Sequence, residues 1–265
     1  VRAMVNLQRN SRGELGEYFN MAIGRPGEPG SIFKAVTLAT LLEDGHVTLD
    51  TKIPTNHGKM ADLSKIRDDQ YIKDYEKNKN TDRISILDGF KISSNYVFRR
   101  LTIDNYQENP QDFINRLYDY RLNDSYTFAL KEKGGTSSRI QQPSSKYDLA
   151  STAIGYSIME TPLNMLTFYN AIANNGKLMK PYLIESFETD GKAHKEFNPE
   201  VLNGSIVSKA TADTLTRALK MVTLEGTATR LKNAKCEVAG KTGTAWTVLR
   251  PEEQPLKGRP FESIN

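Results

Sequence analysis

The sequence predicts a globular α/β protein, because apolar helical segments alternate with short extended ones along the chain. The clearest helix spans residues 31–42, where apolar residues cover nearly the whole circumference, as expected of a buried helix. A second helix spans residues 161–173, with a proline in its first turn and an Asn-Gly pair after its end. Short strands are predicted before Pro54 and on both sides of the Asp190-Gly191 turn.

The remaining elements follow from the same rules of periodicity and capping. Further helices are expected over residues 84–90, from Tyr96 onward, over 110–120 and over 208–223. Further strands are expected over residues 1–7, 181–187 and 236–244. Between them, residues 56–82 are strongly polar and are interpreted as an exposed excursion with a solvated face, and residues 134–146 as a long loop.

Composition excludes several classes of function. The chain has 265 residues, of which 38% are hydrophobic and 26% charged, which is typical of a globular protein with a sizeable core. The net charge of +4 is mild and no basic block is interleaved with aromatic residues, so we expect no nucleic-acid partner. Cys236 is the only cysteine, and the three histidines are isolated, so we expect no disulfide, no metal and no cofactor. There is no apolar run of about 18 residues and no signal peptide.

The start of the 31–42 helix carries the first candidate site. Ser31 and Lys34 are three residues apart and therefore share one face. Keeping a lysine neutral at pH 7 means lowering its pKa from about 10.4 to about 7, which costs about 4 kcal/mol and can come from burial. Such an amine can take the proton of a neighbouring hydroxyl. The alternative is an N-cap serine followed by a surface lysine, since this spacing arises by chance about once in a chain of this length.

Two further short motifs follow along the chain. Ser93-Ser94-Asn95 lies on the link between two predicted helices, where polar side chains can face a cleft, although either serine could simply cap the second helix. Lys241-Thr242-Gly243 lies in the predicted 236–244 strand, whose small residues suit the close approach of another backbone or a substrate. Each motif alone is a weak signal, and the order of the three motifs along the chain is more specific than any one of them.

The order Ser31-x-x-Lys34, Ser93-x-Asn95, Lys241-Thr242-Gly243 is the signature of penicillin-binding proteins and serine β-lactamases. Beyond these motifs, the sequence resembles the transpeptidase domain of class B penicillin-binding proteins over nearly the whole chain to Ala245. The stretches that carry the resemblance are residues 28–31, 155–166, 169–176 and 225–228. Residues 109–114 and the 169–176 stretch also resemble division-type members from Bacteroides-like bacteria.

The resemblance implies a serine β-lactamase/penicillin-binding transpeptidase fold: an antiparallel sheet flanked by helices, plus an all-helical lobe. It also implies a role for each motif residue. Ser31 is the expected acyl-accepting nucleophile and Lys34 its base, an assignment that is disputed in this superfamily. Ser93, helped by Lys241, is expected to relay a proton to the leaving amine, and Asn95 to hold the substrate's amide. The remaining expected substrate-binding residues are Thr242, Gly243 and Thr244, and the backbone N–H groups of Ser31 and Thr244 form the expected oxyanion hole.

The implied reaction is D,D-transpeptidation, in which a stem peptide ending in D-alanyl-D-alanine acylates the serine and an amine from a neighbouring strand takes the acyl group. The implied partners are peptidoglycan stem peptides, β-lactam antibiotics, and cell-division or elongation membrane proteins. The implied location is the periplasmic side of the inner membrane in a bacterial envelope, with the membrane anchor outside this chain.

Two alternative functions remain: another enzyme of the same superfamily, and a protein without catalytic activity. A serine β-lactamase also activates water for deacylation, and Glu160 and Asn164 have the glutamate-to-asparagine spacing of class A enzymes. We interpret Glu160 instead as an acidic residue in the first turn of a helix, where acidic side chains are favoured. The other alternative is a penicillin-recognising sensor or a non-catalytic scaffold. Acylation of Ser31 would separate these possibilities.

Two features depart from the family pattern. Tyr96 stands where family members usually have a small aliphatic residue, which would narrow the cleft. Residues 246–265 form an atypical tail in which no apolar alternation predicts the core strands and helix with which the family continues. We therefore expect residues 1–265 to be one transpeptidase domain that is incomplete at its C-terminal end, with residues 56–82 as an excursion within it.

Overall fold

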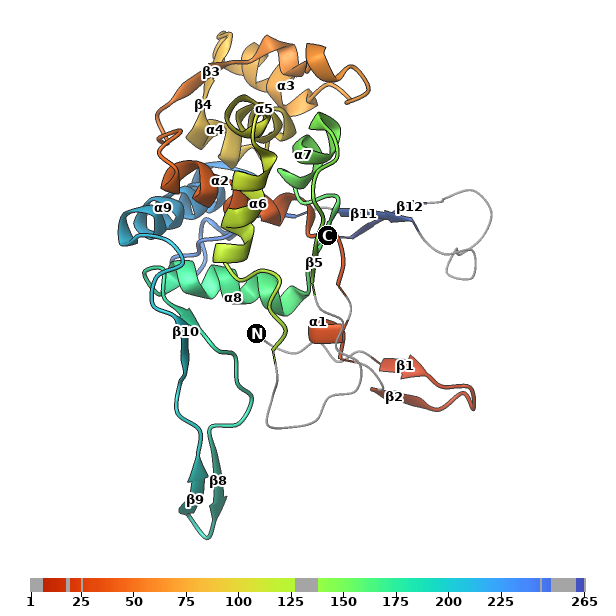
Figure 1. Ribbon diagram of the computed structural model, residues 1–265, viewed down its shortest axis with the longest axis vertical. Coiled ribbons are helices and arrows are strands. Elements are labelled where there is room, and N and C mark those ends of the chain that lie inside the picture. The colour runs from red at the N-terminus through yellow and green to blue at the C-terminus, as the bar shows by residue number, and fades with distance from the viewer. Residues whose placement is uncertain are drawn as a thin grey trace.

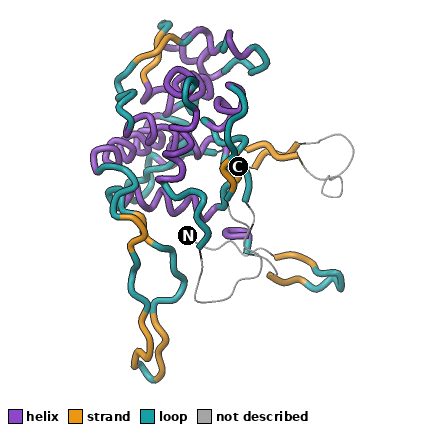
Figure 2. Tube along the Cα trace, in the orientation of Figure 1, coloured by secondary structure: helices purple, strands orange, loops and turns teal. Residues whose placement is uncertain are grey.

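Figure 1 shows the computed structural model of the chain, which describes residues 7–17, 20–24, 26–126, 138–243, 245–248 and 261–264. Helices form the body, and pairs of strands extend from it as narrow arms (Figures 1 and 2). None of the helices in these ranges combines the length and the apolar character needed to cross a membrane.

The predicted 31–42 helix is confirmed and lies at the centre of the body. It begins with a 3₁₀ turn, η1 (Gly30–Phe33), and continues as α2 (Lys34–Glu43), which is buried from Lys34 to Leu41. It ends where Gly45 adopts φ 72°, a left-handed conformation that lets the His46 N–H donate to Leu41 O at 3.0 Å. Because α2 contacts α5, α6 and α9, the residues at its start are fixed by the core.

The helices above α2, and one that runs alongside it, form one lobe (Figure 1). They are α4 (Ile86–Lys91), α5 (Asn95–Tyr106), α6 (Pro110–Asp119) and α7 (Lys146–Thr152). The hydroxyls of Ser85, Ser94 and Ser145 cap α4, α5 and α7 by accepting a backbone N–H from the first turn. The helices predicted at 84–90, from Tyr96 and at 110–120 are confirmed, except that residues 83–85 belong to a strand.

Two longer helices complete the body, one of which packs against α2. They are α8 (Pro162–Ala173) and α9 (Lys209–Glu225), capped by Thr161 and Ser208. Both were predicted with nearly these bounds, because their caps are visible in the sequence. The short α1 (Met21–Gly24) contacts α8, and α8 contacts α9.

In the described parts of the chain, every strand pairs with one antiparallel neighbour rather than joining a single central sheet. The pairs are β1 (Leu7–Arg9) with β2 (Leu15–Glu17), β3 (Lys52–Pro54) with β4 (Arg83–Ser85), β5 (Arg139–Ile140) with β6 (Ile158–Met159), β7 (Leu178–Met179) with β10 (Val201–Asn203), β8 (Ser186–Thr189) with β9 (Lys192–Glu196), and β11 (Ala245–Val248) with β12 (Phe261–Ile264). The predicted turn between β8 and β9 is confirmed, with Asp190 at φ 51° and Gly191 at φ 73°, as a hairpin turn requires.

The prediction of a strand over residues 236–244 is wrong for residues 236–243, which form no strand. Their polar backbone groups bond to α9 instead. The Thr223 hydroxyl donates to Val238 O at 2.6 Å, and the Gly240 N–H donates to Leu219 O at 3.2 Å. After this segment, β11 and β12 pair with each other, a pairing that the sequence did not indicate. The predicted strand over 1–7 and part of the 134–146 loop lie outside the described residues.

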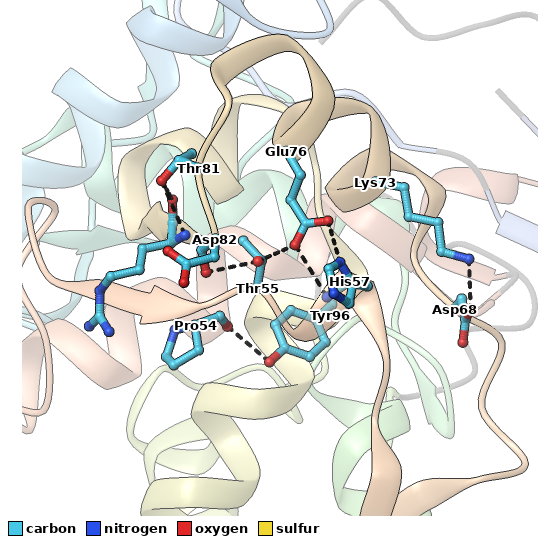
Figure 3. Close-up of polar contacts among 10 residues, drawn as sticks. Pro54, Thr55, His57, Asp68, Lys73, Glu76, Thr81, Asp82 and Tyr96 are labelled. Atoms are coloured by element: carbon cyan, nitrogen blue, oxygen red, sulfur yellow. Dashed lines mark hydrogen bonds and ion pairs between the residues drawn. The ribbon is translucent and has the colours of Figure 1, made fainter.

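The polar segment 56–82 is more ordered than an exposed excursion. It contains η2 (Asn56–Gly58), η3 (Ala61–Leu63) and α3 (Gln70–Lys79). Met60, Leu63 and Ile72 are buried against the lobe, so only the outer face is solvated. Figure 3 shows Glu76 of α3 reaching Thr55 and His57, which holds α3 to the end of β3.

Candidate active site

Ser31 lies in η1 and is held by the backbone on both sides. Gly30 adopts φ 58° and its N–H donates to Gly155 O at 3.0 Å, and a Cβ on Gly155 would lie 2.2 Å from Gly30 O. On the other side, the Tyr169 hydroxyl donates to Ile32 O at 2.8 Å. A glycine at position 155 is therefore required for the close approach that fixes the serine.

Lys34, one turn after Ser31, is completely buried. Its Nζ lies 3.1 Å from Ser31 Oγ and donates to Ser93 O at 2.6 Å. Burial lowers the pKa of the amine well below its ordinary value, the charge of Lys241 lowers it further, and the charge of Asp69 opposes the shift. The alternative of a surface lysine is therefore wrong. So is that of an N-cap serine, since Pro29 is at the N-cap position.

Ser93 lies on the turn between α4 and α5, and two lysines reach its hydroxyl. Lys34 Nζ lies 3.2 Å and Lys241 Nζ 2.7 Å from Ser93 Oγ. Ser93 has φ 58°, which is uncommon for a residue with a side chain. The capping alternative holds for the neighbouring Ser94 alone, whose hydroxyl accepts the Val97 N–H at 3.1 Å.

Lys241 completes this group from the other end of the chain. Its Nζ lies 5.7 Å from the centre of the Phe90 ring, and burial lowers its pKa to about 7. Two amines on one hydroxyl cannot both be charged without strong repulsion. Lys34 is fully buried, and the charge of Lys241 further disfavours its protonated form, so Lys34 is the amine better placed to act as a neutral base, while Lys241 titrates near neutral pH.

The other predicted site residues lie beside this group. Gly243 packs on η1, because a Cβ there would lie 2.7 Å from Ile32 Cγ2, and this contact places the 241–243 segment along the serine. Thr242 Oγ1 lies 2.6 Å from Thr227 Oγ1. Asn95 is the first residue of α5, and none of the hydrogen bonds that join the serines to the lysines involves it. Thr244 lies outside the described residues.

The residues that hold the motifs in place were not predicted from the sequence to have a role in the site. Tyr169 and Gly155 fall within stretches that carried the family resemblance, but nothing in the sequence indicated what these two residues contact. Asp69 has a weaker signal: an acidic residue just before a helical segment, which predicts an N-cap and nothing more. Its contacts with the Ser93 turn come from residues far apart in sequence.

Glu160 does not lie in the first turn of α8, as was predicted, but one residue before its N-cap. Its backbone bridges to Gly27, with both N–H···O distances at 2.9 Å. The side chain is 3% exposed, and neither carboxyl oxygen has a hydrogen-bond partner among the described residues. Burial raises its pKa to about 8. A neutral, buried acid does not resemble a base that activates water.

This buried carboxyl predicts a pH-dependent cost to stability. Below pH 4.5 the group is neutral in both the folded and the unfolded chain; between pH 4.5 and about 8 only the unfolded chain ionises, so the folded chain loses stability. We expect Glu160→Met to raise the free energy of unfolding by about 3 kcal/mol at pH 7 and to have a much smaller effect at pH 4.5. Urea unfolding at both pH values checks this. The exposed Glu196→Met is the matched control, and an equal gain at both pH values would contradict the assignment.

A buried lysine amine beside a serine hydroxyl at a helix start is an arrangement typical of one class of protein, the serine acyltransferases. The family model described as "Penicillin binding protein transpeptidase domain" matches residues 1–259. The chain therefore belongs to the penicillin-binding protein transpeptidase domain family, and the predicted fold class is confirmed.

Similar proteins agree with this membership. Penicillin-binding protein PbpB of Mycolicibacterium smegmatis is 27% identical over 85% of this chain, and stage V sporulation protein D of Bacillus subtilis is 25% identical over 86%. The D,D-transpeptidase domain of a peptidoglycan glycosyltransferase from Eggerthella lenta is 28% identical, with a TM-score of 0.73, and the match covers 85% of this chain and 55% of that one. The chain spans about a third of the length of the two curated relatives, 34% in each case.

Proposed function

We propose that this chain is the catalytic part of a peptidoglycan D,D-transpeptidase that works through an acyl-enzyme on Ser31. The observation that carries the proposal is the fully buried Lys34 with its amine 3.1 Å from the serine hydroxyl. A serine hydroxyl is a weak nucleophile at neutral pH and needs an adjacent base. A neutral lysine amine within hydrogen-bond distance supplies that base.

In the first half of the reaction, Ser31 Oγ attacks the carbonyl carbon of the penultimate D-alanine and its proton passes to Lys34. The negative charge on the carbonyl oxygen is stabilised by the Ser31 backbone N–H, with that of Thr244 as the second proposed donor. The C–N bond then breaks, and the leaving D-alanine amine takes a proton through the Ser93 hydroxyl. Lys241, 2.7 Å from that hydroxyl, is placed to assist the transfer.

In the second half, the amine of an acceptor stem peptide attacks the acyl-serine. The proton of that amine leaves by the same route, and Ser31 is regenerated. We assign binding of the donor's terminal carboxylate to Thr242 and Thr244, with the charged Lys241 nearby, and binding of the donor's amide to Asn95. Gly243 packs closely on Ile32, which keeps this segment beside Ser31, where an extended donor peptide would lie. β-Lactams would acylate Ser31 as mimics of the donor.

The β-lactamase alternative is not favoured, because Glu160 is a buried acid with a raised pKa rather than a base. The sensor or scaffold alternative lacks support, since the lysines and serines are arranged for proton transfer. We further propose that residues 1–265 act as one transpeptidase unit at the periplasmic side of a bacterial inner membrane, with division or elongation membrane proteins as partners. The family membership supports a role in the cell envelope.

Two assays test the function. With a donor peptide ending in D-alanyl-D-alanine and glycine as a simple amine acceptor, we expect release of D-alanine and formation of the donor–glycine product, measured by mass spectrometry. With benzylpenicillin, we expect a 1:1 adduct that persists for many minutes, because Glu160, the residue with the spacing of a water-activating base, is a buried acid with a raised pKa. Rapid turnover of nitrocefin that is lost in Glu160→Gln would instead support the β-lactamase.

A further inference from the structure

Asp69 lies outside the three motifs, at the start of α3, yet its side chain is buried beside the second motif, with 8% exposed. Its Oδ1 accepts the Tyr71 N–H at 3.0 Å and caps α3. Its Oδ2 accepts two more hydrogen bonds, from the Ser94 hydroxyl at 2.7 Å and from the Tyr96 N–H at 2.9 Å. A carboxylate from the polar segment 56–82 therefore holds the start of α5.

These two bonds fall on either side of Asn95 and begin one residue after Ser93. Hydrogen bonds to an ionised carboxylate are shorter and stronger than those between neutral groups. The Ser94 hydroxyl cannot turn away from the carboxylate without cost, because it also accepts the Val97 N–H at 3.1 Å. Asp69 thereby fixes the residues that follow Ser93 in one conformation.

Ser93 needs such support because its φ of 58° is unfavourable for a residue with a Cβ. The Ser93 N–H donates to Phe90 O at 3.1 Å and the Ser94 N–H donates to Gly89 O at 2.9 Å. In this conformation the carbonyl and the hydroxyl of Ser93 both face Lys34, at 2.6 and 3.2 Å from its Nζ. A relaxed turn would lose at least one of these contacts.

The charge of Asp69 also acts on Lys34. Three charged side chains act on its amine: Lys241 and Arg99 are positive and disfavour its protonation, and Asp69 is negative and favours it. Asp69 also acts on the partly buried Arg99. Loss of the Asp69 charge would leave the cations of the site without this counter-charge.

We propose that Asp69 is the positioning residue of the Ser93 turn, holding the Ser93 hydroxyl between Lys34 and Lys241 for proton transfer. This proposal rests on the proposed function of Ser31. The 56–82 segment would then have a role in the site, because it contains Asp69.

Asp69→Asn is the most informative variant, because asparagine keeps the size of the side chain and can still cap α3. It cannot accept all three hydrogen bonds. We expect the rate of acylation by benzylpenicillin to fall about tenfold. We also expect the acid limb of the pH–rate profile to move to lower pH, because removing the negative charge lowers the pKa of Lys34.

Asp68→Asn is the matched control, one residue earlier on the same segment. Asp68 is 40% exposed and pairs with Lys73 at 2.7 Å (Figure 3), whereas the bonds to Ser94 and Tyr96 belong to Asp69. We expect its rate and its profile to match the wild type. If Asp69→Asn fails to fold, Asp69→Ser keeps a cap for α3 and serves in its place.

The outcomes separate this proposal from the proposed function. If the wild type is not acylated, the proposed function fails. Hydrogen exchange of the Tyr96 N–H still tests whether Asp69 fixes the turn, and we expect it to be faster in Asp69→Asn than in Asp68→Asn. An acylated wild type with an unchanged rate in Asp69→Asn overturns the positioning role. A slower rate with an unmoved acid limb also overturns it, because loss of fold alone would have that effect.

Discussion

Ser31→Ala is expected to abolish covalent binding of benzylpenicillin and release of D-alanine. Ser31 is part-buried in η1, where its neighbours Gly30 and Ile32 bond to Gly155 and Tyr169, and its hydroxyl lies 3.1 Å from Lys34 Nζ. Removing that oxygen removes the atom that forms the ester, while the fold keeps its contacts. Intact-mass spectrometry of the protein after incubation with the drug measures the result directly.

Ser64→Ala is the control for this experiment, since Ser64 is exposed and lies after η3, away from the motifs. It is expected to gain one drug mass, as the wild type does. An adduct that persists in Ser31→Ala would show that another residue is the nucleophile, and peptide mapping would identify it.

Lys34→Met is expected to slow acylation about a thousandfold, the usual contribution of a positioned base. Methionine has a similar length and fills the buried site, so the loss comes from the missing amine rather than from a cavity. The acid limb that belongs to Lys34 should disappear from the residual rate, and the pH dependence that remains should be that of Lys241, whose pKa is about 7. Stopped-flow measurement of acylation by nitrocefin between pH 5 and 9 gives both the rate and its profile.

Lys192→Met is the matched substitution on the exposed β9 strand. It is expected to keep the wild-type rate and profile. The assignment of Lys34 as the base would be wrong if Lys34→Met retained more than about a tenth of the wild-type rate while remaining folded, since a base contributes at least about a hundredfold.

The helices were largely predictable, because their signals are local. Thr161 and Ser208, the first residues of two predicted helices, are the caps of those helices, and the apolar circumference of the 31–42 helix correctly indicated burial of Lys34. The strands were less predictable. Pairing depends on partners far along the chain, and residues 236–243 bond to α9 although their composition suits a strand.

The candidate site was predictable only as an ordered set of motifs. Spacing within a helix placed Ser31 beside Lys34, but nothing local says that Ser93 and Lys241, which are 148 residues apart, share one hydrogen bond. The left-handed conformation of Ser93 and the carboxylate of Asp69 that supports it were not predictable either. Both depend on tertiary packing of a segment whose composition suggested a solvated face.

The central claim is that Lys34 carries no proton at neutral pH beside Ser31. Titration of ¹³Cε-labelled lysine by NMR tests it, with Lys34→Met identifying the resonance. We expect the Lys34 signal to have the chemical shift of a neutral amine at pH 7 and to move only on acidification, with Lys241 titrating separately near pH 7. A Lys34 signal that keeps the shift of a charged amine up to pH 9 would contradict the account.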